Sequence, residues 1–230
     1  MEAPTRKERE MDNIIERMRI NLEKAHVKGI PEYIKRLHDN RKSEKFEDFH
    51  LEGRAALMFS QAGFDVTLRE SPDLALQFNN KQLYAEVTHF RKKEQDRLDD
   101  AKMRGLGDED ELVPYGNTYS LEGKHAWEQV YEVAIKKINQ YKEHAPNMLV
   151  IESSSSCIED TEIPSAIDMI NEDVNSGKCP GLARLNGILL ITVDEFNIPQ
   201  WREVFPYYTC NPSVTLSKEL KHLLDNIRLS

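Results

Sequence analysis

Two short segments of alternating apolar and polar residues, separated by Asn79-Asn80, constrain the fold of this chain more than any other feature. Residues 72–78 read PDLALQF, and residues 81–90 read KQLYAEVTHF. A period of two is typical of β-strands that bury one face, and the Asn-Asn pair suits a tight turn. The sequence therefore predicts a β-hairpin over residues 72–90.

Helical and extended patterns alternate around this hairpin. The run GILLITV at residues 187–193 is apolar throughout, as expected of a strand buried on both faces. Strands that cluster early and then alternate with helices predict an α/β fold, a mixed sheet with helices on both faces. The further strands are expected at residues 64–69, 148–152 and 204–209, and the helices at residues 5–26, 32–38, 45–62, 121–143, 163–174 and 217–227.

The chain divides into an N-terminal helical appendage, residues 1–44, and a core, residues 45–230, that carries a polar insertion at about residues 91–120. The appendage is expected to pack on the core or to form a homodimer. Its alternative role is to grip a substrate through its basic side chains, Arg17, Arg19, Lys35 and Arg36.

Composition restricts the classes of function. The chain lacks an apolar run near the roughly 20 residues of a membrane span, and its first residues carry charge throughout. No membrane partner and a cytoplasmic location are therefore expected. Three widely spaced cysteines, Cys157, Cys179 and Cys210, favour free thiols over a zinc site or disulfides. A net charge of −9 argues against a nonspecific DNA coat, although a basic rim can be local.

Carboxylates mark the expected functional site. Because strand side chains alternate between faces, Asp73 and Glu86 share the hairpin face opposite the apolar residues. Glu52 lies on the helical stripe of residues 45–62 that is expected to face the sheet. Buried carboxylates need a neutralising partner, and Mg²⁺ or Mn²⁺ is a suitable one because hard cations prefer oxygen ligands.

These segments, HLEGRAALMFSQAGFDV, SPDLALQF and QLYAEVTHF, resemble the PD-(D/E)XK nuclease, or restriction-endonuclease-like, superfamily. Glu52 corresponds to its helix glutamate, Pro72-Asp73 to its Pro-Asp, and Glu86-Val87-Thr88 to its Glu-x-Lys, with threonine in place of lysine. The resemblance implies a restriction-endonuclease-like core and metal-dependent hydrolysis of nucleic acid, with DNA as the expected substrate. Asp73, Glu86 and the Val87 carbonyl would hold Mg²⁺ or Mn²⁺, and Glu52 would bind through water or a second ion.

The missing lysine directs attention to the helix expected at residues 121–143. At about 100° per residue, Lys137 lies near the apolar stripe of this helix, whereas Lys136 points to solvent. Lys137 is therefore the candidate that positions the attacking water, and a lysine at the rim of the core is its structural alternative. Lys92 and Lys142 are weaker candidates. Tyr84, His89 and Arg91 are close in sequence and could contact phosphate.

Other interpretations stay open. Asp73 could be a turn residue, Glu86 an exposed partner of Lys81, and Glu52 a charge that stabilises its helix end. A degenerate nuclease fold could bind nucleic acid or protein without cutting, and a scaffold protein could act through the N-terminal helices.

Overall fold

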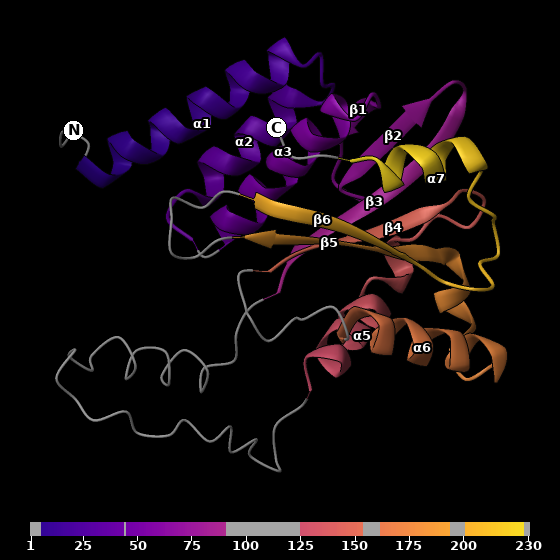
Figure 1. Cartoon of the computed structure of the whole chain (residues 1–230). Helices are drawn as coiled ribbons and strands as arrows, with labels where there is room; N and C mark the ends of the chain where they lie inside the picture. Colours follow the sequence, from indigo (N-terminus) through magenta and orange to yellow (C-terminus); the bar gives the residue numbers. More distant parts are fainter. Residues whose placement is uncertain (1–5, 44, 91–124, 154–161, 194–200, 228–230) are drawn as a thin grey trace, which may run out of the picture.

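The computed structural model describes residues 6–43, 45–90, 125–153, 162–193 and 201–227. Its fold is mixed α/β, with one six-stranded mixed sheet flanked by helices (Figure 1). The helices are α1 (Arg6–Lys24), α2 (Ile30–Asn40), α3 (Lys45–Gln61), α5 (Ala126–Lys136), α6 (Glu162–Asn175) and α7 (Lys218–Asp225). The strands are β1 (Asp65–Leu68), β2 (Leu74–Phe78), β3 (Lys81–His89), β4 (Asn147–Ser153), β5 (Leu185–Val193) and β6 (Trp201–Tyr208).

The strands lie in the order β1-β2-β3-β4-β5-β6. The predicted hairpin is present: β2 and β3 are antiparallel, and both turn residues, Asn79 and Asn80, have positive φ. β4 is parallel to both β3 and β5, and β6 closes the edge as an antiparallel strand. The sheet therefore changes from antiparallel to parallel pairing at β3, the strand that carries Glu86.

Helices cover both faces of the sheet, as predicted (Figure 1). Helices α1, α2, α3 and α7 pack on one face, where Leu74, Leu83 and Val87 belong to one hydrophobic cluster. Helices α5 and α6 pack on the other face, where Leu149 and Ile188 belong to a second cluster. Alternation along β3 thus directs Val87 toward α3 and Glu86 toward α5.

The N-terminal helices share the hydrophobic cluster of α3 and the sheet. Tyr33 of α2 is fully buried and donates a hydrogen bond to the Phe49 carbonyl of α3 at 2.9 Å. Gly53 permits this approach, because a Cβ there would lie 2.1 Å from the Tyr33 hydroxyl oxygen. These contacts fix α3, and with it Glu52, against α2. The separation of residues 1–44 as an appendage stays a prediction.

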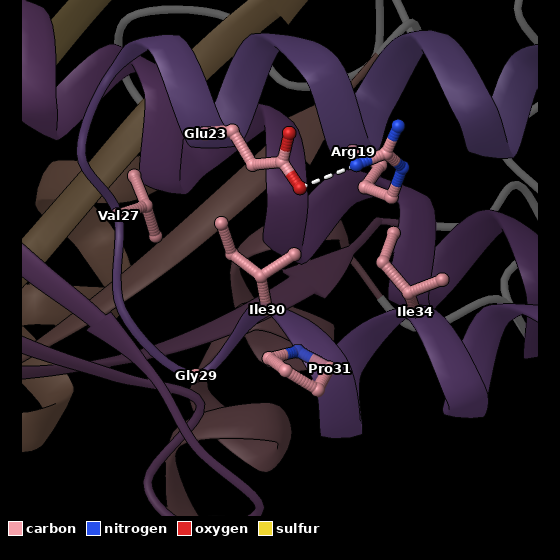
Figure 2. A pocket seen from close by; sticks show the side chains of 7 residues that line it. All are labelled: Arg19, Glu23, Val27, Gly29, Ile30, Pro31 and Ile34. Carbon is pink, nitrogen blue, oxygen red and sulfur yellow. Dashed lines mark hydrogen bonds and ion pairs between the residues drawn. The ribbon is translucent and has the colours of Figure 1, made fainter.

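A hollow of about 450 Å³ lies between α1 and α2 (Figure 2). Ile30 and Ile34 point from α2 toward an exposed ion pair on α1, formed by Arg19 and Glu23. Arg19 is also paired with Glu16, so its charge is already compensated within α1. The predicted homodimer through these helices stays a prediction.

The helix predicted at residues 121–143 is too long. Residues 121–124 lie outside the described ranges, and α5 ends at Lys136 before a 3₁₀ turn, Ile138–Gln140. The reason is Tyr141, whose buried ring packs under α5 and whose hydroxyl donates to the Ala134 carbonyl at 3.3 Å. Apolar residues continue at helical spacing through this turn, but the backbone is no longer α-helical there.

The predicted polar insertion, residues 91–120, lies outside the described residues, as does Cys157. Cys179 and Cys210 are free thiols. None of the helices in the described ranges combines the length and the apolar character that a membrane crossing requires.

Candidate carboxylate–lysine site

Asp73 and Glu86 lie side by side where β2 begins. Leu74 pairs with Ala85, so the antiparallel register brings the preceding Asp73 level with Glu86. Asp73 is 7% exposed and accepts a hydrogen bond from the Val87 backbone N–H at 2.8 Å. Asp73 is therefore no ordinary turn residue. Its carboxylate accepts a backbone hydrogen bond of β3, as a carbonyl of a neighbouring strand would, and this bond holds Asp73 against β3.

Glu86 is 1% exposed and pairs with Lys137, not with Lys81, which pairs with Glu219 instead. Lys137 Nζ lies 2.8 Å from Glu86 Oε2. Lys137 itself caps the C-terminal end of α5, where the chain leaves the helix and its side chain can turn toward the sheet. The ammonium group thus reaches the carboxylate from a helix, while Thr88 occupies the position two residues after Glu86.

Glu52 enters the site from α3 and is held by Arg36 of α2. It is 6% exposed, and Arg36 Nη2 lies 2.9 Å from Glu52 Oε2. This distance suits an ion pair, although the direction of approach does not give a well-formed hydrogen bond. The same guanidinium donates to the Arg69 carbonyl and packs over the Phe49 ring at 5.1 Å. Arg36, predicted as a possible substrate contact, therefore positions a carboxylate.

The three carboxylates influence one another. Burial raises the pKa of Glu86 and of Glu52, and the charge of Asp73 raises both further, while Lys137 lowers both. Burial also raises the pKa of Asp73. Burial lowers the pKa of Lys137, but the Asp73 charge and the bond to Glu86 raise it more, so it stays protonated. When every group is ionised, three negative charges face two positive ones, which leaves one negative charge uncompensated.

Two of these carboxylates fit a divalent cation. Glu86 Oε1 is buried and accepts no hydrogen bond from a donor among the described residues, while the Glu86 and Asp73 carboxyl groups lie close enough to share a proton or a cation. Asp73 lies beside it, and Mg²⁺ commonly binds one or two carboxylates together with water. No group of three or more His, Cys, Asp or Glu side chains in the described ranges is arranged to hold a metal. Glu52 therefore belongs with Arg36, and the fit concerns Asp73 and Glu86.

The other residues considered from the sequence are dispersed. Tyr84 lies on the Glu86 face with Arg69 and Lys142 near its ring. His89 lies on the opposite face of β3 and contacts Asp48 at 3.1 Å. Arg91 and Lys92 are outside the described residues.

A second buried polar network was not predicted from the sequence. Glu152, at the end of β4, is 6% exposed and contacts both Arg54 at 3.1 Å and His89 Nε2 at 3.2 Å. Its only sequence signal is a charge that ends an apolar strand.

In comparisons by sequence and by structure, no family model, curated protein or solved structure matches this chain.

Proposed function

We propose that this protein has a restriction-endonuclease-like core and is a divalent-metal-dependent nuclease that hydrolyses phosphodiester bonds of DNA. One observation carries the proposal: two buried, adjacent carboxylates, Asp73 and Glu86, share a site with a protonated lysine, and one Glu86 oxygen has no hydrogen-bond partner in the described part of the chain. The same residues supply the motif resemblance, and the element order of α3, β1, β2, β3, α5 and β4 agrees with it.

Each residue has a role in this proposal. Asp73, Glu86 and the Val87 carbonyl would hold Mg²⁺ or Mn²⁺, which when bound would lower the pKa of a water molecule and neutralise charge on the phosphate. Lys137 keeps its proton, so it acts as a hydrogen-bond donor and positive charge that orients the attacking water and the phosphate. Arg36 holds Glu52 at the border of the site, from which Glu52 can accept a hydrogen bond from water.

The direct test is cleavage of labelled single- and double-stranded DNA and RNA with Mg²⁺, Mn²⁺ or EDTA. We expect metal-dependent cleavage of DNA that falls at least about 100-fold in Asp73→Asn and Glu86→Gln. Glu47→Gln is the matched control, because Glu47 is exposed on α3 and carries no role in the site. Wild-type protein without metal-dependent cleavage, or cleavage that survives in Glu86→Gln, would contradict the proposal.

A second candidate function has its own support. Both Glu52 and Glu86 already have a protein cation beside them, so the cluster can persist without metal, as expected of a degenerate nuclease fold that binds nucleic acid or protein. Binding of the same oligonucleotides in EDTA, with no cleavage under any metal condition, would favour this candidate.

A further inference from the structure

The Tyr84 ring lies beside the carboxylate–lysine site and has two cations near it. Tyr84 precedes Glu86 by two residues on β3, so both side chains leave the same face of the strand. The guanidinium carbon of Arg69 is 5.8 Å from the ring centroid, and Lys142 Nζ is 6.0 Å from it. Arg69 comes from the end of β1, and Lys142 follows the 3₁₀ turn that begins after Lys137.

These two cations differ from the other cations of the site. Lys137 and Arg36 are paired with Glu86 and Glu52, whereas neither Arg69 nor Lys142 has an ion-pair partner within the described part of the chain. This is notable in a chain with 40 acidic and 31 basic residues. Two uncompensated positive charges beside an acidic cluster are suited to a ligand that carries negative charge.

Arg69 also borders a cleft of about 540 Å³ between α2 and the end of β1, together with Lys35 and Arg36. Glu32, Asp39 and Glu70 line the same cleft, so its charge is mixed. Arg69 and Lys142, which have no ion-pair partner in the described ranges, both lie near the Tyr84 ring.

We propose that Arg69, Tyr84 and Lys142 form a subsite that binds the phosphate backbone of a DNA strand next to the carboxylate–lysine site. Nucleic-acid grooves commonly combine cations that follow the backbone with an aromatic ring that contacts a base or sugar. The inference rests on the proposed function, because the strand held there is the substrate of Asp73 and Glu86. It adds the residues that hold this strand.

The test is binding of a fluorescein-labelled DNA oligonucleotide, single-stranded and duplex, followed by anisotropy in EDTA at several salt concentrations. We expect Arg69→Gln with Lys142→Gln to weaken binding about 10-fold or more and to reduce the slope of log affinity against log salt by between about 1 and 2. Tyr84→Leu should weaken binding with little change in this slope. Among the described residues, Arg69 and Lys142 form hydrogen bonds through their backbone atoms only, so the fold should survive both substitutions, and the melting temperature of the double variant checks this.

Lys221→Gln is the matched control. Lys221 Nζ lies 4.4 Å from the Tyr208 ring centroid, which makes a similar contact on β6, three strands away from β3. Binding that is equal in the double variant and in Lys221→Gln would overturn the subsite, even if the protein cleaves DNA. Absence of DNA binding in the wild type would also overturn it. Binding that depends on Arg69 and Lys142 without cleavage would support the subsite and reject the nuclease.

Discussion

At the scale of single residues, we expect Lys137 to contribute both to cleavage and to the stability of the fold. Lys137 forms an ion pair with the buried Glu86, and the nearby negative charge of Asp73 helps to keep Lys137 protonated. We expect Lys137→Met to reduce cleavage at least about 100-fold, because the site loses its donor and positive charge. We also expect it to lower the free energy of unfolding by about 1–3 kcal/mol, because Glu86 is left buried without its ion-pair partner.

Lys136→Met is the control for this prediction, because the neighbouring side chain is exposed. Single-turnover cleavage and urea unfolding of both variants provide the comparison. Wild-type cleavage in Lys137→Met would remove Lys137 from the proposed mechanism. Equal unfolding free energies in the two variants would show that the pair with Glu86 contributes no stability.

At the scale of elements, His89 ties α3 to β4 through Asp48 and Glu152. Burial lowers the pKa of His89, but its two hydrogen bonds to carboxylates raise it more, to about 9. The folded protein therefore keeps the imidazole proton at pH values where the unfolded chain, with a pKa near 6.5, has lost it. The stabilisation is complete below about pH 6.5 and is lost as the pH rises toward 9.

Urea unfolding at pH 6 and at pH 9.5 tests this linkage. We expect the wild type to lose about 2 kcal/mol more than His89→Gln between these two values, given about 1.4 kcal/mol per pKa unit and partial exposure. His144→Gln is the control, because His144 is an exposed histidine on the loop before β4. Parallel losses in the wild type and in His89→Gln would contradict the assignment.

Element patterns in the sequence predicted most of the fold and part of the site. The Asn79-Asn80 turn fixes the hairpin register, and this register is what brings Asp73 level with Glu86. Such local rules cannot give contacts between distant elements. The partner of Glu52 is Arg36, from a different helix, and its choice depends on how closely α2 approaches α3. The end of α5 was missed for the same reason, since it depends on the tertiary position of Tyr141.

At the scale of the whole molecule, the site is a charge imbalance inside a chain of net charge −9. When all three buried carboxylates are ionised, the two cations leave one negative charge uncompensated, and burial opposes this ionisation by raising the pKa values of the three groups. A divalent cation bound at Asp73 and Glu86 would relieve this repulsion in the folded state only. Metal binding should therefore appear as stability of the entire fold, whether or not the protein cleaves a substrate.

Thermal unfolding with increasing Mn²⁺ measures this coupling without any substrate. At a free Mn²⁺ concentration of about 100 times its dissociation constant, the expected gain is about 2.7 kcal/mol, which corresponds to roughly 5–10 °C in Tm for a chain of this size. Asp73→Asn combined with Glu86→Gln should lose this Mn²⁺ response, and its Tm is compared with and without Mn²⁺ because the loss of Glu86 also leaves Lys137 without its ion-pair partner. Glu47→Gln should keep the response. An equal Mn²⁺ shift in all three proteins would assign the binding to the acidic surface and leave Asp73 and Glu86 without a metal.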